Sequence, residues 1–239
     1  MRRPAAPFLV NALSFVGSAV LVIALRTTIA SRAPAGPGLM REIGEGVRWL
    51  WRHRPLRALV LLLTVWNLVE NAYVAVLVLY ALEVLHVGAS FYGLLLTGLA
   101  VGAVAGAAAA PWMERRWGTG GVIALTVVVD VVATSGLAVT RAALVAAALL
   151  GVVGFGAFAF NVVSATYRQT AVPDALRGRV TSAYRFATWG VTPLGAALGG
   201  LVAAGFGLPA VFLLAGVVLT AVSALTLPLL TNRRPAAGA

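Results

Sequence analysis

Three polar residues inside an otherwise apolar stretch are the strongest candidates for chemistry in this sequence. Asn67, Glu70 and Asn71 lie in the run from 55 to 80, which is long enough to cross a bilayer as one helix. Their spacing of three and four residues places all three on one helical face. A carboxylate at membrane depth is costly, so it usually faces a water-filled cavity or a protein partner. The pattern therefore indicates a path for a solute.

Two interpretations of this polar face are open. In the first, the face and its neighbours Trp66 and Tyr73 line a cavity that binds a cation, a proton or a polar group of a substrate. In the second, Glu70 is a buried carboxylate that pairs with an arginine of a neighbouring helix. We favour the first, because pairing alone would not require two asparagines beside the carboxylate.

Other polar positions are candidates for the same path. Arg185 could bind an anionic group, lock Glu70 or extend to the cytoplasmic headgroups, and we favour one of the two structural roles. Asn161 and Ser164 share a helical face near the end of another apolar run. Asp130 lies in the middle of an apolar run, where an aspartate is a functional candidate by default.

The composition requires a membrane protein. Of the 239 residues, 61% are hydrophobic and 10% are charged, whereas a soluble domain carries about 25% charged residues. The net charge is +11, but the 18 arginines lie in short segments between apolar runs, which argues against a nucleic-acid partner. With two histidines and no cysteine we expect neither a metal site nor a cofactor. The absence of G-x-S-x-G, H-E-x-x-H and Walker motifs argues against an enzyme.

Seven apolar runs predict seven transmembrane helices and thus an all-α membrane protein. The expected spans are 7–25, 58–82, 91–113, 120–139, 142–165, 181–204 and 207–230. The first run could also be a signal peptide, but its length and the lack of a cleavage site favour a span. The break at Arg141 is a single residue, yet without it the helix would be too long for a bilayer.

The spans and their connections divide the chain into four parts. Residues 1–26 form the first transmembrane helix, and 58–230 form a six-helix unit. Residues 27–57 are a cytoplasmic linker with an arginine-rich amphipathic helix, which is typical of the membrane interface, although a solvated helix is the alternative. Residues 231–239 are a tail.

Small residues and arginines add two further expectations. Two rows of glycine predict close helix contacts, and one proline predicts a kink: Gly98, Gly102 and Gly106; Gly195 and Gly199; Pro193. If 26–57 is cytoplasmic, strict alternation places 15 of the 18 arginines on the cytoplasmic side. The C-terminus is then expected in the cytoplasm.

Three segments of the chain resemble the major facilitator superfamily. They are EGVRWLWRHRPLRALVLLL at 45–63, GAAAAPWMERRWG at 106–118, and PDALRGRVTSAYRFATWGVTPLGAALGG at 173–200. Their order and spacing look most like those of the bacterial drug- and siderophore-exporter branch, the transmembrane secretion effector group.

The resemblance suggests residues for the gating loops. The second segment is similar to the superfamily's cytoplasmic G-x3-D-R-x-G-R-R motif, with Glu114, Arg115 and Arg116 near its charged core. The L-R-G-R-V run, which contains Arg177 and Arg179, fits the start of helix 11 of that fold.

The resemblance also implies an architecture. The chain would supply helices 6 to 12 of twelve and lack an N-terminal half, and an inverted 3+3 repeat would relate 58–139 to 142–230. Helices 58–82 and 142–165 would line the cavity. The helix at 120–139 would be peripheral, which weakens Asp130 as a substrate residue.

The function implied is a secondary active transporter in the bacterial plasma membrane. It would export amphiphilic small molecules such as drugs or siderophores, by proton antiport, with the lipid bilayer and the missing half as partners. The alternative is a non-transporting remnant, or a half-transporter that needs a partner chain.

Overall fold

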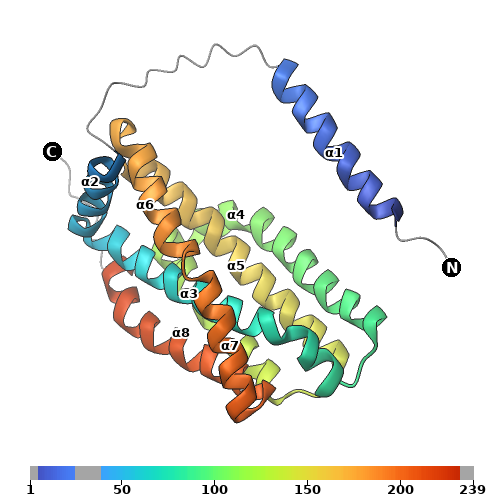
Figure 1. Ribbon diagram of the computed structural model, residues 1–239. Helices are drawn as coiled ribbons and strands as arrows, with labels where there is room; N and C mark the ends of the chain where they lie inside the picture. Colours follow the sequence, from blue (N-terminus) through green and yellow to red (C-terminus); the bar gives the residue numbers. More distant parts are fainter. Residues whose placement is uncertain (1–4, 25–38, 232–239) are drawn as a thin grey trace. The chain divides into compact units, whose positions relative to one another are not determined.

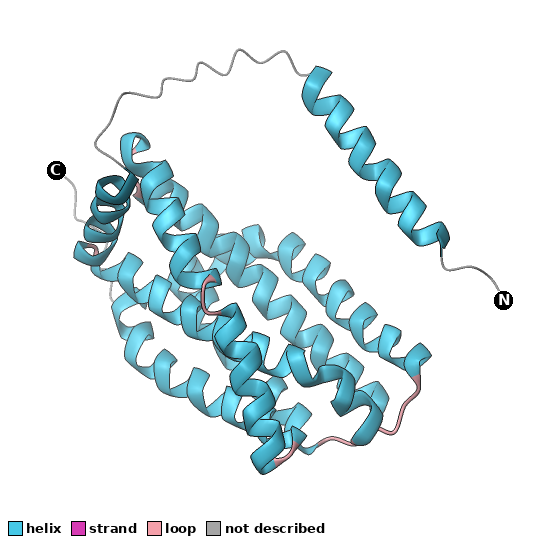
Figure 2. Cartoon of the chain, viewed as in Figure 1, coloured by secondary structure: helices cyan, strands magenta, loops and turns pink. Residues whose placement is uncertain are grey.

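The computed structural model describes helices within residues 5–24 and 39–231, and every regular element in these ranges is helical (Figure 2). The all-α prediction is therefore confirmed for this part of the chain. The chain divides into two units, Met1–Pro37 and Gly38–Ala239. The first unit contains α1 (Ala5–Ala24), which matches the span expected at 7–25. Arg2 and Arg3, the linker at 27–38 and the tail at 232–239 lie outside the described residues.

The second unit contains the remaining helices (Figure 1). They are α2 (Leu39–Arg52), α3 (Arg54–Glu83), α4 (Ala89–Val139), α5 (Ala143–Ala171), α6 (Arg177–Trp189), α7 (Thr192–Phe206) and α8 (Leu208–Thr231), with a 3-10 turn at Asp174–Leu176 before α6. Five stretches of this unit are long and apolar enough to cross a membrane: Arg54–Glu83, Phe91–Val139, Ala143–Ala171, Arg177–Phe206 and Leu208–Leu230.

Helix α4 holds two of the predicted spans. Its apolar stretch of 49 residues would measure about 75 Å as one straight helix, more than twice the roughly 30 Å of a bilayer core. The helix is broken at Gly118, whose φ of 69° and ψ of 166° are not helical. A positive φ is readily adopted only by glycine, so the break is set by the sequence.

Contacts with α5 show that the chain reverses at this break. Before Gly118, the residues Gly98, Gly102 and Gly106 follow α5 in the same direction, next to Ala147, Gly151 and Phe155. After Gly118 the order is opposite, because Thr126 lies next to Gly156 and Gly136 lies next to Leu149. Two antiparallel segments therefore flank α5, as the spans 91–113 and 120–139 require. With α1, seven helices fit the seven expected spans.

Two other breaks agree with the sequence. Helix α4 ends at Val139 and α5 begins at Ala143, which confirms the short break around Arg141. The span expected at 181–204 is divided into α6 and α7 at Gly190 and Val191. Pro193 lies in the first turn of α7, where its missing N–H group costs no hydrogen bond.

Helix α3 is at the centre of the second unit, in contact with α2, α5, α6, α7 and α8. Its buried aromatic side chains contribute to the core together with Phe212 of α8. The hydroxyl of Tyr80 donates a hydrogen bond of 2.6 Å to the carbonyl oxygen of Leu137 and so ties α3 to the end of α4. On the opposite flank, Gly195 and Gly199 bring α7 against the backbone of α3, as the glycine row predicted.

The glycine contacts lead to a prediction about stability. A β-carbon at Gly102 would overlap the carbonyl oxygen of Gly151, whereas a β-carbon at Gly93 of the same helix would meet no atom. Gly102→Ala should therefore separate α4 from α5 at a cost of about 1–3 kcal/mol. We expect it to lower the midpoint of thermal unfolding in detergent micelles, and Gly93→Ala not to lower it. Equal midpoints for the two variants would contradict this packing.

Candidate functional site

A cavity of about 320 Å³ lies between α3, α5 and α6. Five of the residues predicted from the sequence lie on its wall, and six others complete it. The predicted ones are Trp66, Asn67, Glu70, Asn161 and Arg185, and the others are Leu63, Ala157, Phe160, Arg168, Tyr184 and Trp189. The residues belong to three helices and are up to about half the chain apart in the sequence. Folding brings them together at the cavity.

The asparagines are accommodated in their apolar helices by hydrogen bonds to the preceding turn. The side-chain N–H group of Asn67 donates to the carbonyl oxygen of Leu63 at 2.9 Å, and that of Asn161 donates to Ala157 at 2.9 Å. In this arrangement each amide oxygen remains available as an acceptor. Asn67 and Asn161 therefore add hydrogen-bond acceptors to a cavity that is otherwise lined by aliphatic, aromatic and charged side chains.

The aromatic side chains of the wall differ in their burial. Trp66 is buried and packs against Phe160, with 4.9 Å between the ring centroids. Trp189 on α6 is 67% exposed. The guanidinium carbon of Arg168 lies 3.6 Å from the ring centroid of Tyr184, a distance at which the cation and the ring attract each other.

The charges in the cavity are one carboxylate and two guanidinium groups. Glu70 is half-buried and, among the described residues, makes no ion pair with Arg168 or Arg185. The interpretation of Glu70 as the partner of an arginine therefore has no support in this arrangement. The carboxylate can bind a proton, a cation or a hydrogen-bond donor that enters the cavity.

Three predicted residues lie away from the cavity. Asn71 lies next to Gly195 of α7, and its side-chain N–H group donates to the carbonyl oxygen of Asn67. Tyr73 is buried and stacks on Phe212 of α8. Ser164 is buried in α5, and its hydroxyl donates to the carbonyl oxygen of Asn161 at 3.1 Å. The polar face expected on α3 is thus divided, because α7 and α8 cover the side that carries Asn71 and Tyr73.

Arg168 is the main residue that the sequence reasoning missed. It follows Asn161 by seven positions and Ser164 by four, so helical spacing alone would have placed it on their face. Trp189 follows Arg185 by four positions and Tyr184 precedes it directly, so the sequence places both beside Arg185 on α6.

The residues assigned to gating loops by resemblance lie outside the cavity. Glu114 accepts a hydrogen bond of 2.9 Å from the hydroxyl of Thr119, across the break at Gly118. Arg115 and Arg116 are exposed. Their role in gating remains a prediction.

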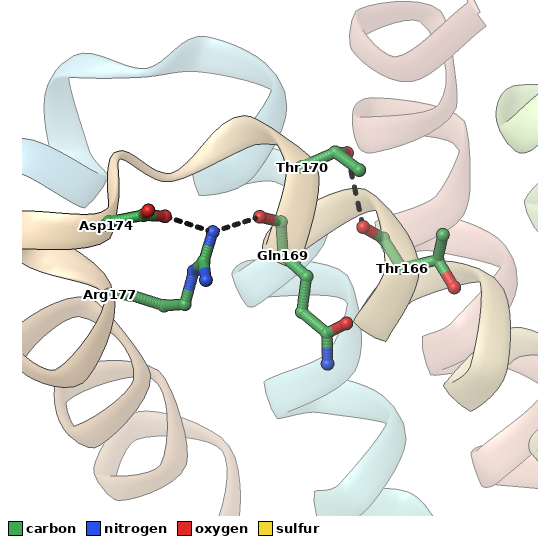
Figure 3. A network of polar contacts seen from close by, with 5 residues as sticks. All are labelled: Thr166, Gln169, Thr170, Asp174 and Arg177. Carbon is green, nitrogen blue, oxygen red and sulfur yellow. Dashed lines mark hydrogen bonds and ion pairs between the residues drawn. The ribbon is translucent and has the colours of Figure 1, made fainter.

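The two arginines at the start of α6 connect it to other elements. Arg177 forms an ion pair with Asp174 and donates a hydrogen bond of 3.2 Å to the carbonyl oxygen of Gln169 at the end of α5 (Figure 3). Arg179 forms an ion pair of 2.8 Å with Glu45 of α2. A β-carbon at Gly46 would collide with the backbone of Arg179, so α2 lies directly on α6. These contacts fix the end of the helix that carries Tyr184 and Arg185.

The comparisons with known proteins give a match to a family model. The family model described as transmembrane secretion effector matches residues 2–235, which is nearly the whole chain. Neither the search of curated proteins nor the search of solved structures found a match.

The two tryptophans of the cavity should differ in their effect on stability. Trp66→Ala would leave a void against Phe160 and should cost about 3–5 kcal/mol, as for other large buried side chains. Trp189→Ala removes a mostly exposed ring and serves as the matched control. We expect only Trp66→Ala to lower the thermal midpoint in detergent by several degrees. A similar loss in both variants would mean that Trp189 is buried in the protein in solution.

Proposed function

Since the chain belongs to the transmembrane secretion effector family of the major facilitator superfamily, we propose that it exports amphiphilic small molecules, such as drugs or siderophores, in exchange for protons. The membrane location and the class of transporter follow from the family and from the apolar helices. The observation that carries the finer proposal is the cavity in which Glu70 lies among aromatic and guanidinium groups and has no ion-pair partner among the described residues.

The cavity wall favours an amphiphile over a small ion. Trp66, Phe160 and Trp189 offer apolar surface to the hydrophobic body of a substrate. Arg168 and Arg185 can bind its carbonyl, phenolate or carboxylate groups. A hydroxyl or ammonium group of the same molecule would bind the carboxylate of Glu70.

Exchange for protons follows if proton and substrate compete for Glu70. In the ionised state the carboxylate accepts hydrogen bonds from the substrate, whereas protonation removes its charge and turns one of its oxygens into a hydrogen-bond donor. A proton that enters from the acidic side of the membrane would then release the substrate, and loss of the proton on the other side would restore the site. Among the residues that the structure describes, Glu70 supplies the one carboxylate of this cavity.

A half-transporter that needs a partner chain is the second candidate. The span at Arg177–Phe206 is only 11% buried, whereas the other four candidate spans are 39–50% buried. Trp189, one of its exposed aromatic residues, lies on the cavity wall, and the exposed Phe186 follows the cavity residue Arg185 in the chain. Alternating access requires a second wall around the binding site, and an N-terminal half from the same or another chain would supply it.

The membrane topology is also a proposal. The arginine distribution supports a cytoplasmic C-terminus and the plasma membrane of a bacterium. On this assignment Arg115, Arg116 and the start of α6 lie on the cytoplasmic side.

The role of Glu70 can be tested with ethidium, a fluorescent amphiphilic cation, in liposomes that contain the 239-residue chain. We expect a proton gradient to drive ethidium efflux, and Glu70→Gln to reduce it to the level of protein-free liposomes, because the amide cannot exchange a proton. The control is Glu83→Gln, the same substitution at an exposed position of the same helix.

Two outcomes would change the proposal. Normal gradient-driven efflux by Glu70→Gln would remove Glu70 from the coupling mechanism. No efflux by the unaltered chain, restored when a chain with the five remaining spans is added, would establish the half-transporter.

A further inference from the structure

Helix α2 divides its apolar side chains between the protein and the outside. Leu50 is 4% exposed and belongs to the hydrophobic core, and Gly46 lies against the backbone of Arg179 on α6. Val47 and Trp51 lie on the neighbouring side of the helix and are 45% and 53% exposed. The described part of the chain therefore leaves one apolar strip of α2 uncovered.

Two arginines border this strip. A shallow groove on the surface of α2 is lined by five exposed residues, which are Gly44, Val47, Arg48, Trp51 and Arg52. Among the described residues neither Arg48 nor Arg52 forms an ion pair, and the carboxylate of Glu45 is directed to Arg179 at 2.8 Å. The groove thus combines apolar surface with two positive charges that the described part of the chain does not neutralise.

The groove lies at the end of the unit where two membrane spans begin (Figure 1). Helix α2 ends at Arg52, and the next span begins at Arg54. Its other contact is with Arg179, near the beginning of the span Arg177–Phe206. A helix that is attached to the ends of two spans is held at the level of the lipid headgroups, because the spans themselves fill the hydrocarbon core.

An anionic phospholipid fits this combination of groups at this depth. Its phosphodiester accepts hydrogen bonds from guanidinium groups, and tryptophan is typical of the boundary between headgroups and acyl chains. A zwitterionic phospholipid would also cover the apolar strip, but its own cation would oppose the arginines. An acidic peptide would match the arginines, but it would not place hydrocarbon against the strip.

We propose that Arg48 and Arg52 bind the phosphate of an anionic phospholipid whose acyl chains cover Val47 and Trp51. The two arginines are four residues apart and so point to the same side of the helix, where one headgroup can reach both. None of the residues of this groove lines the cavity that contains Glu70, so the lipid site does not depend on the proposed function.

A fluorophore in the groove can report which lipid occupies it. The chain contains no cysteine, and a β-carbon at Gly44 would meet no atom, so Gly44→Cys can carry the label in the complete chain. The labelled protein is placed in vesicles of phosphatidylglycerol, which is anionic, and phosphatidylcholine, which is zwitterionic. A small fraction of one lipid or the other then carries a nitroxide on its acyl chain, which quenches a fluorophore that it contacts.

We expect nitroxide-labelled phosphatidylglycerol to quench at about a fivefold lower mole fraction than nitroxide-labelled phosphatidylcholine, or lower still, because each arginine near the membrane surface favours an anionic lipid about fivefold. Arg48→Gln combined with Arg52→Gln should make the two lipids equal quenchers. The matched control is Arg115→Gln combined with Arg116→Gln, which removes the same charge from exposed arginines of α4 and should leave the preference intact.

Three results would overturn the proposal. They are equal quenching by the two lipids when both arginines are present, a preference that survives the double substitution in α2, and quenching by neither lipid, which would place α2 in water. Arg48→Lys combined with Arg52→Lys keeps the charge and should keep most of the preference, which distinguishes loss of binding from loss of the fold. Failure of ethidium efflux with the lipid preference intact would refute only the proposed function.

Discussion

The close approach of helix backbones around α3 and α5 is the interaction on which the rest of the structure depends. Gly195 and Gly199 let α7 lie on α3, and the row that begins at Gly98 lets α4 lie on α5. In lipid there is little hydrophobic gain from bringing helices together, so van der Waals contact along such rows must hold the bundle. These contacts hold α3 and α5 in the bundle, and the two helices supply most of the residues of the cavity wall.

The packing gives different surroundings to the two carboxylates in apolar helices, Glu70 and Asp130. Glu70 is on the side of α3 that faces α5 and α6, where Asn67 and Arg185 keep the surroundings polar. Asp130 is enclosed by helices whose contacting surfaces are apolar, and the hydroxyls near it are bonded to the backbone. One acid is therefore open to a cavity, and the other is enclosed by protein.

Much of this arrangement could be read from the sequence, because membrane helices follow simple rules. Hydropathy and length predicted the spans, and the helices show breaks in the predicted gap at 114–119 and around Arg141. Spacing placed Asn67 and Glu70 on one face, and both line the cavity. Spacing failed for Asn71, because residues four positions apart still differ in direction, and the neighbouring helix decides which of them it covers. Which helix that is depends on contacts distant in sequence, and no local pattern contains them.

The part of the cavity wall that α6 supplies is positioned by elements outside the cavity. At one end α6 is held by Arg177, which bonds to the end of α5, and by Arg179, which pairs with Glu45 of α2. At the other end it stops at Gly190, before α7 begins. Tyr184 and Arg185 therefore lie between the end of α6 that these ion pairs hold and the break before α7. Tyr184 also contacts α5 through the guanidinium group of Arg168. A displacement of α2 would therefore be transmitted to the cationic side of the cavity, while the Trp66 and Phe160 side, packed in the core, would stay in place.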